Sequence, residues 1–187
     1  MDYNDIVIST YFVGSSAPSF YERKEFDLRF VVAHDRWTDF RNIIQHVNQL
    51  QEDDVVIICY EDHLFTSDYQ VEPFIKQILM CAKIGTQLLL GGCGGCANLV
   101  PVRNGLYWVD RFEHSSFYAV FRPAFQPILE ALPDEDACLE EKLSVILANK
   151  MLISPFVSQT VSDNGYASKQ LALFNYVINK YHMELAR

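Results

Sequence analysis

The sequence lacks long apolar runs and an excess of positive charge. No apolar run approaches the roughly 20 residues that a membrane helix needs, and the acidic start at 1–5 has neither the basic nor the apolar region of a signal peptide. Fifteen Lys and Arg residues against 24 Asp and Glu residues give a net charge of −9, which argues against a broad nucleic-acid or anionic-membrane footprint. We therefore expect a cytoplasmic protein that binds no nucleic acid and makes at most peripheral membrane contact.

The number of cysteines is odd. Five cysteines without an export signal predict reduced thiols and not a disulfide framework. Cys93 and Cys96 form a single CxxC without a second pair, so the pattern favours ordinary loop residues; a zinc or redox site remains the weaker alternative. The 187 residues, half of them hydrophobic, suit one domain with a sizeable core.

The stretch from Asp53 to Thr66 organises the rest of the chain. Val55–Tyr60 is rich enough in β-branched residues to predict a strand buried on both faces. Glu61, Asp62 and His63 follow directly. Ligands of open α/β sheets bind just beyond the carboxyl ends of such strands, so three metal-capable side chains stand where a site is expected.

Strand and helix patterns alternate around this segment. The alternation predicts an α/β fold with a mainly parallel, mixed sheet flanked by helices in one small domain. In chain order the predicted elements are strands at 6–8, 28–33, 55–60 and 87–90, and helices from 38 and over 68–82, the second ending at Gly85.

Polar residues also follow the other predicted strands. Ser9 and Thr10 come after the first strand and either meet a nucleotide or phosphate or cap their own turn. Asp35 comes after the second strand and either accepts hydrogen bonds from a base or ribose or caps the helix that starts near Thr38. Both roles of Asp35 are compatible.

The glycine-rich run 91–96 follows the strand at 87–90. Gly91 and Gly92 let the backbone pass close to something bulky, so a loop over a ligand is expected here. The spacing differs from a P-loop, and no Lys-Ser or Lys-Thr follows.

The pattern changes after Pro101. Two aromatic strands, at 106–112 and 117–121, predict a hairpin appended to the parallel core, with Asp110 in the first. Asp110 either lies on the solvent face or, beside aromatic rings, holds a sugar hydroxyl or acts as a base. Helices are predicted from Pro123 and over 137–149, where Glu140 and Glu141 are solvated or are site acids, and finally over 168–185.

Taken together, these segments resemble a bacterial glycosyltransferase of the small GT-A type, similar to the lipopolysaccharide-modifying galactosyltransferase-like group. The resemblance covers residues 54 to 166 in order, and no single motif is specific. It is carried by five runs: YEDHLFT at 60–66, LLLGG at 88–92, FYAV at 117–120, LEEKLS at 139–144 and ISPFVSQ at 153–159.

The resemblance implies a metal and a nucleotide sugar. In this family the acids after the central strand hold a divalent cation, Mn²⁺ or Mg²⁺, against the donor diphosphate. Glu61 and His63, at alternate positions, are the implied metal pair, and Asp62 is the rival ligand or a donor-binding residue. Residues 1–100 would form the nucleotide-binding half, and 101–187 the acceptor half with the C-terminal helix.

The implied activity is transfer of a hexose from a UDP-sugar type donor to a glycan or lipopolysaccharide acceptor. Glu140, Glu141 and Asp110 are the candidate bases. The donor pocket would be lined by Ser9, Thr10, Asp35, Asp62, Gly91 and Gly92. The alternative is a catalytically degenerate module of the same fold that binds a nucleotide sugar or a partner protein without turnover. The oligomeric state is left open.

Overall fold

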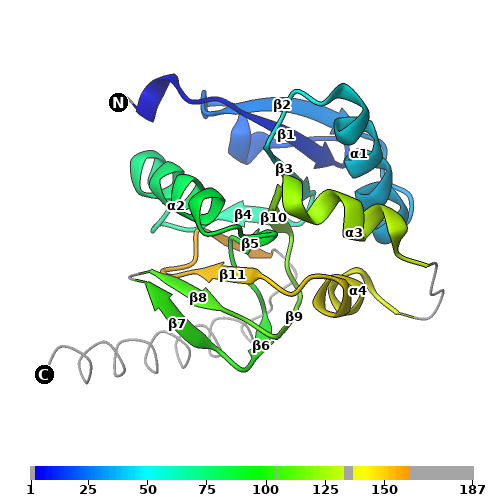
Figure 1. The fold of residues 1–187 in the computed structure, drawn as a ribbon. Helices are drawn as coiled ribbons and strands as arrows, with labels where there is room; N and C mark the ends of the chain where they lie inside the picture. The colour runs from blue at the N-terminus through cyan, green and yellow to red at the C-terminus, as the bar shows by residue number, and fades with distance from the viewer. Residues whose placement is uncertain (1–2, 104, 133–136, 161–187) are drawn as a thin grey trace, which may run out of the picture.

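The computed structural model describes residues 3–103, 105–132 and 137–160, and its centre is an eight-stranded sheet (Figure 1). The strand order is β2-β1-β3-β10-β5-β11-β8-β7. In that order the strands are Phe26–Val31, Ile8–Val13, Val55–Tyr60, Phe117–Phe121, Leu88–Leu90, Lys150–Ile153, Leu106–Trp108 and Val100–Arg103.

The sheet is mixed but mainly of one direction. Strands β2, β1 and β3 pair in parallel, β5 and β11 do the same, and β10 lies antiparallel between these two groups. Strand β8 also runs in the opposite direction, between β11 and β7. The predicted α/β class with a mixed, mainly parallel sheet is confirmed. Two small antiparallel pairs complete the strands: β4 (His63–Phe65) with β12 (Ser158–Thr160), and β6 (Gly95–Ala97) with β9 (Arg111–Glu113).

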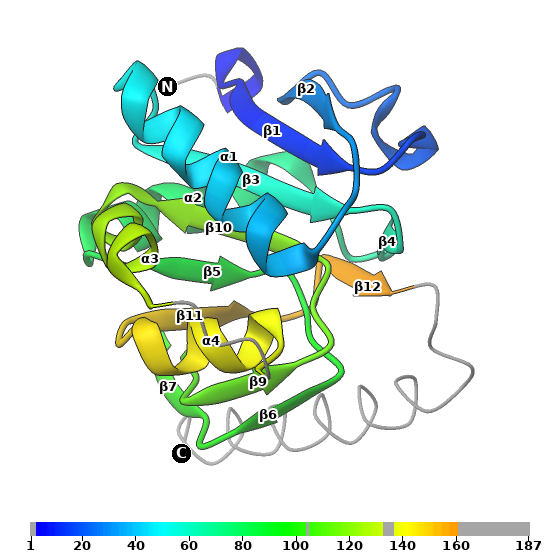
Figure 2. The same ribbon diagram turned by 90° about the vertical axis from the view of Figure 1, so that its right-hand side faces the viewer.

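Helices cover both faces of the sheet (Figure 2). One face packs against α1 (Arg36–Leu50), α3 (Phe125–Glu130) and α4 (Leu139–Ile146), and the other packs against α2 (Val71–Lys83). Strand β3 serves both faces because successive side chains point to opposite sides. Its even-numbered residues join the first core cluster, while Ile57 and Cys59 join the second. Short 3-10 turns lie at Tyr3–Asp5 (η1), Pro18–Phe20 (η2) and Arg122–Ala124 (η3).

The first strand is longer than predicted. The sequence predicts a strand at 6–8, but β1 runs over Ile8–Val13 and is buried along its whole length. Ser9 and Thr10 therefore lie inside the strand and not beyond its end. The Thr10 hydroxyl donates to the carbonyl oxygen of Ile8 at 2.9 Å, which satisfies the hydroxyl without a ligand. The central strand Val55–Tyr60 and the end of α2 before Gly85, whose φ is +69°, agree with prediction.

The predicted hairpin of 106–112 with 117–121 is wrong. The first segment is broken at Val109 and Asp110 into β8 and β9, and β10 lies in the middle of the sheet, far along the strand order from β8. All five residues of β10 are buried. A strand that is apolar on both faces is stabilised in the centre of a sheet, where helices cover both sides, more than in an edge hairpin.

The remaining predicted helices are shorter than expected or undescribed. The Pro123 helix begins as η3 and continues as α3, and the helix expected at 137–149 is α4. The helix expected at 168–185 lies outside the described residues. Among the described helices, none is long and apolar enough to cross a membrane.

Candidate functional site

Strands β1, β2 and β3 end together at one edge of the sheet, here called the carboxyl edge (Figure 2). The backbone N–H of Gly14 donates to the carbonyl of Val31 at 3.0 Å, and that of Glu61 donates to Val13 at 3.1 Å. A Cβ on Gly14 would lie 2.7 Å from the Cβ of Glu61. Glycine after β1 thus lets the turn of Glu61 pack against the end of β1.

A group of buried and half-buried polar side chains lies beside this edge, on the face of α1 and α4. We call it the Arg36 cluster, and its members are Arg36, Tyr60, Asp62, Ser115, Tyr118 and Glu140.

Arg36 connects the parts of the cluster. Asp35 caps α1 by accepting from the backbone N–H of Thr38 at 2.9 Å, so the first helical turn places Arg36 at the carboxyl edge. Arg36 Nη2 donates to the carbonyl oxygen of Ser115 at 2.7 Å and lies 3.8 Å from Glu140 Oε1. Its guanidinium carbon lies 4.2 Å from the ring centre of Tyr60. The capping role of Asp35 is confirmed, and its role toward a base or ribose stays a prediction.

Two polar atoms of the cluster are buried without a hydrogen-bond partner among the described residues. They are Asp62 Oδ1, an acceptor, and Arg36 Nε, a donor. Burial raises the pKa of Asp62, while the charge of Arg36 lowers it. A buried polar atom that lacks a partner costs about 1–3 kcal/mol, so an unsatisfied acceptor and donor in one cluster call for a further partner such as a water, an ion or a ligand.

Glu140 is a member of this cluster and not part of a solvated face. Its side chain is buried, and Oε1 accepts from the Tyr118 hydroxyl at 3.2 Å and from the Ser115 backbone N–H at 3.4 Å. Burial raises the pKa of Tyr118, and the neighbouring Glu140 raises it further. The solvated alternative for Glu140 is therefore wrong, and its role as a site acid stays a prediction.

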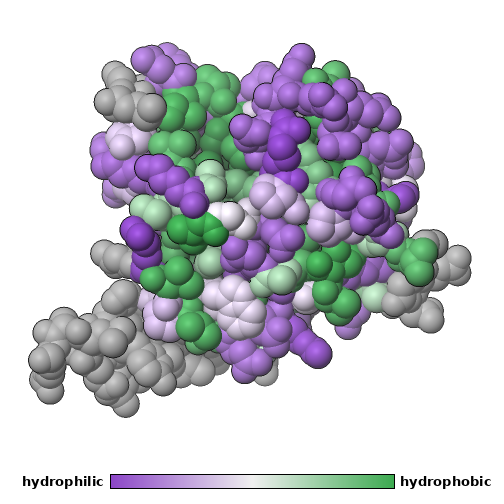
Figure 3. Space-filling model, viewed as in Figure 1, coloured by the Kyte–Doolittle hydropathy of each residue, from purple (hydrophilic) through white to green (hydrophobic). Residues whose placement is uncertain are grey.

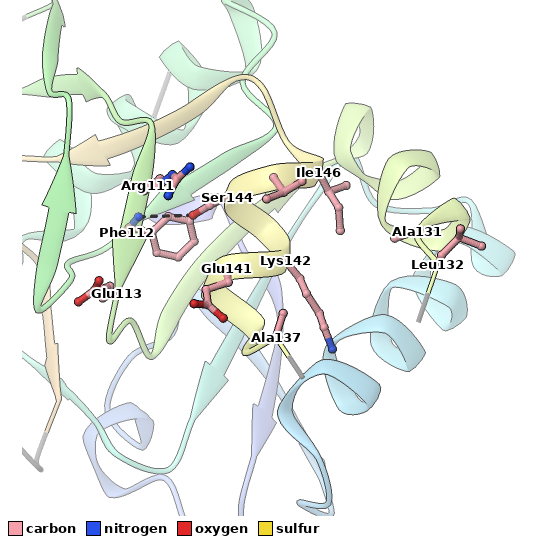
Figure 4. A pocket seen from close by; sticks show the side chains of 11 residues that line it. Arg111, Phe112, Glu113, Ala131, Leu132, Ala137, Glu141, Lys142, Ser144 and Ile146 are labelled. Carbon is pink, nitrogen blue, oxygen red and sulfur yellow. Dashed lines mark hydrogen bonds between the residues drawn. The ribbon is translucent and has the colours of Figure 1, made fainter. Parts of the chain in front are cut away.

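Glu141, one residue further along α4, points elsewhere. Its Oε2 accepts from the backbone N–H of Cys138 at 3.1 Å, which closes a capping box at the start of the helix. Glu141 also lines a cavity of about 670 Å³ between β9, α4 and the end of α3 (Figure 4). The other polar residues of this cavity are Arg111, Glu113, Lys142 and Ser144.

His63 does not join Glu61 and Asp62. Its imidazole is 3 % exposed and packs among the rings of Phe20, Phe65 and Phe117, on the α2 face. Nδ1 hydrogen-bonds to Ser158 Oγ at 2.8 Å, and burial lowers the pKa of His63 to about 3. The structure thus separates His63 from the metal position for which the sequence favours it. Glu61 stays near Asp62, whose pKa its charge raises.

Of the other predicted donor residues, Gly92 contacts the cluster, because its carbonyl oxygen accepts from the Ser115 hydroxyl at 2.8 Å. No hydrogen bond joins Ser9, Thr10 or Gly91 to a cluster member within the described residues. Thr10 is fully buried within β1. A Cβ on Gly91 would lie 2.6 Å from Phe117, and one on Gly92 would lie 2.1 Å from the carbonyl oxygen of Ser158. The bulky neighbour expected at these glycines is therefore the chain itself. Ser9 also lies within β1, 9 % exposed.

Asp110 lies near the opposite edge of the sheet. It accepts from Asn98 Nδ2 at 3.1 Å, and its charge acts on Lys150, the first residue of β11. Strand β11 runs in the same direction as β1, so its first residue is remote from the carboxyl edge.

The CxxC thiols are neighbours. Cys93 and Cys96 are free and partly buried, and a hydrogen bond between their side chains raises the pKa of Cys93 and lowers that of Cys96. Within the described ranges no group of three or more His, Cys, Asp or Glu side chains could hold a metal ion.

Comparison with known proteins identifies the fold. No protein-family model and no curated protein sequence matches the chain. UDP-glucose pyrophosphorylase complexed with UDP-glucose is similar with a TM-score of 0.50 at 11 % identity, over 83 % of this chain and 68 % of that one. The chain thus shares the fold of this pyrophosphorylase.

Two further structures have lower scores. A197 from STIV matches with a TM-score of 0.45 at 9 % identity, over 79 % of this chain and 82 % of its own. HddC from Yersinia pseudotuberculosis matches with a TM-score of 0.44 at 12 % identity, over 81 % of this chain and 68 % of its own. At these identities the likeness is one of fold alone.

Of the Arg36 cluster, the sequence patterns predict only Asp62 and Glu140 as site residues. Arg36 stands in the polar run HDRW after the second predicted strand, so a signal for it existed. The sequence holds no such signal for Ser115 and Tyr118. Their position at the carboxyl edge depends on β10 being a central strand that begins beside the end of β3.

Proposed function

We propose that this protein binds a nucleotide sugar at the Arg36 cluster and transfers its hexose to a glycan or lipopolysaccharide acceptor. The observation that carries the proposal is the pair of buried, unpartnered polar atoms, Asp62 Oδ1 and Arg36 Nε, at the carboxyl edge. Ligands of open α/β sheets bind at this edge. The fold is shared with a UDP-glucose pyrophosphorylase that was solved with UDP-glucose, which supports the ligand class without establishing the activity.

Arg36 supplies the positive charge that a departing diphosphate requires. Its guanidinium is fixed by the Ser115 carbonyl, the Tyr60 ring and Glu140, so it is already oriented before a ligand arrives. Fixed charges that face developing negative charge stabilise a transition state because they need no reorganisation. Arg36 Nε is buried without a partner among the described residues, and it would donate to a phosphate oxygen once ligand binding opens the cluster.

Glu61 and Asp62 fit a divalent cation, and His63 does not. The carboxylates are adjacent at the turn after β3, Asp62 keeps one oxygen unpartnered, and the Glu61 side chain is exposed. Mg²⁺ is commonly bound by one or two carboxylates together with substrate phosphates and water, so two acids suffice. A bound Mg²⁺ or Mn²⁺ would offset the negative charge of the leaving diphosphate. We place the proposed metal on Glu61 and Asp62.

Glu140 is the base candidate that shares the cluster with Asp62. In the proposed reaction, a single inverting displacement, a carboxylate takes the proton of the acceptor hydroxyl as that oxygen bonds to the anomeric carbon of the sugar. The bond from this carbon to the diphosphate oxygen breaks at the same time, and the nucleoside diphosphate leaves. Glu141 faces the cavity beside α4, and Asp110 lies near the opposite edge. We therefore assign the base role to Glu140 and keep Glu141 for acceptor contacts.

A second candidate function is binding of a nucleotide sugar without turnover. It is favoured by the state of Glu140, which is buried and already accepts two hydrogen bonds in the absence of any ligand. It is also favoured by the small number of acids, since no three-residue metal group occurs in the described segments.

Calorimetric titration with UDP-glucose, with and without Mn²⁺, tests the proposal. We expect binding that tightens with Mn²⁺, slow release of glucose from the donor, and loss of the Mn²⁺ effect in Asp62→Asn. Asp110→Asn is the matched control and should bind as the unaltered protein does. Metal-dependent binding without release of glucose would favour the binding module. Absence of UDP-glucose binding would overturn the proposed site. So would an equal loss of the Mn²⁺ effect in Asp62→Asn and Asp110→Asn.

A further inference from the structure

Strand β2 is an outer edge of the sheet. It pairs with β1 on one side, and no described strand pairs with its other side (Figure 2). Phe30 is 52 % exposed and Val32 76 % exposed, although both belong to or follow this strand. Figure 3 shows hydrophobic side chains reaching the surface at the top of the molecule, where β1 and β2 lie in Figure 1. An open edge with apolar side chains is a template for pairing with another strand.

The backbone direction of β2 determines which residues face outward. The Ile8 N–H donates to the Glu25 carbonyl, and the Gly14 N–H donates to the Val31 carbonyl. Residues of a parallel strand alternate between its two sides, so the odd-numbered residues of β2 bond toward β1. Phe26, Leu28 and Phe30 therefore turn their N–H and C=O groups to the open side.

From this register we infer that β2 is the contact between two copies of this chain, paired antiparallel about a two-fold axis at Leu28. In this arrangement Leu28 faces its own copy, and Phe26 faces Phe30 of the second copy. The outward N–H and C=O groups of Phe26, Leu28 and Phe30 would then all pair with the same groups of the second copy.

The charges of β2 match the same register. Asp27 of one copy stands opposite Arg29 of the other, twice around the axis, at positions where the side chains of antiparallel strands approach most closely. Both side chains are exposed, 54 % for Asp27 and 40 % for Arg29, and within one chain they already pair at 3.1 Å. A shift by one residue would place Asp27 opposite Leu28 or Phe30 and would lose this match. The sequence of β2 is thus complementary to itself in one register.

The apolar face of β2 supports the pairing. Phe26 is buried against Phe20, Phe65 and Phe74, and Phe30 contacts Phe12 with half of its surface free. In the dimer the free part of Phe30 would extend the ring cluster around Phe26 of the second copy. The second copy would thus cover apolar surface that one chain leaves exposed.

Sedimentation equilibrium of the full chain tests the inference. We expect twice the monomer mass at tens of micromolar protein and weaker association at high salt. Arg29→Asp places like charges opposite each other twice, so it should weaken the dimer roughly tenfold or more. The double variant Asp27→Arg with Arg29→Asp restores opposite charges and should restore the dimer.

Lys76→Glu is the matched control, because it disrupts an exposed ion pair, Glu72–Lys76, on α2. It should leave the mass unchanged, and circular dichroism should show every variant folded. A monomeric unaltered protein at 100 µM, or a dimer that Arg29→Asp leaves intact, would overturn the inference. So would a double variant as weak as the single one.

Discussion

The hydroxyl of Tyr118, in the middle of the sheet, shares its single proton between the carbonyl oxygen of Ser115 at 2.6 Å and Glu140 Oε1, on α4, at 3.2 Å. The same two residues, Ser115 and Glu140, contact Arg36 on α1. One buried hydroxyl thus ties the central strand to the helix that carries the candidate base. The arrangement links the stability of the core to the geometry of the proposed site.

Glu140→Gln should reduce turnover of the donor more than donor binding. The amide keeps the size of the side chain but cannot take a proton from an attacking hydroxyl, and removal of a negative charge beside Arg36 does not weaken the attraction of its guanidinium for a diphosphate. We expect roughly a hundredfold slower release of glucose from UDP-glucose, with a calorimetric affinity close to that of the unaltered protein. Glu72→Gln, on the exposed face of α2, is the control. Equal rates of glucose release in the two variants would remove the base role from Glu140.

His63 should make the protein unstable in mild acid. The folded protein holds the pKa of His63 at about 3 against an ordinary 6.5, so the unfolded chain takes up the proton first. The contribution of neutral His63 is complete above pH 6.5 and is lost as the pH falls toward 3, by up to about 1.4 kcal/mol per pH unit.

His63→Phe should flatten this pH dependence. A phenyl ring suits the surrounding Phe20, Phe65 and Phe117, although it leaves Ser158 Oγ without the imidazole. The measurement is the free energy of unfolding in urea at several pH values between 4 and 7. His34→Gln, at an exposed imidazole, should keep the slope of the unaltered protein. An unchanged slope in His63→Phe would show that another group causes the acid sensitivity.

Gly92→Ala should destabilise the fold by about 1–3 kcal/mol, the usual cost of overpacking. The new Cβ would lie 2.1 Å from the carbonyl oxygen of Ser158, a backbone atom that cannot move without disturbing β12. Gly95→Ala is the matched control, because its Cβ would meet only the end of the Glu113 side chain at 3.4 Å. Urea denaturation measures both, and similar midpoints would contradict the close approach.

Cys96 should react with iodoacetamide before Cys93. The hydrogen bond between the two thiols lowers the pKa of Cys96 and raises that of Cys93, and the thiolate is the reactive form. Mass spectrometry of the labelled peptides across pH 6–9 gives each rate separately. Cys93→Ala removes the hydrogen bond and should move the Cys96 profile to higher pH. A profile that does not move would mean that the thiols act independently.

Elements with a local signature were predictable. The central strand Val55–Tyr60 and the end of α2 before Gly85 follow from short-range periodicity and from backbone preferences. The start of α1 at Asp35 follows from a capping side chain three residues from its partner N–H. The prediction of a single strand over 106–112 is wrong. The aromatic residues of this segment are compatible with one long strand and equally with two short ones, β8 and β9, separated by a bend.

By itself the sequence determined that strands and helices alternate and that Glu61 and Asp62 follow the central strand, because hydrophobic period and chain order are local properties. Only the tertiary structure decided that β10 enters the middle of the sheet and that Arg36 meets Glu140 and Asp62. It also placed His63 among phenylalanine rings and not beside the acids. These outcomes depend on which apolar faces are buried against each other, and this is settled by packing between segments distant in the chain.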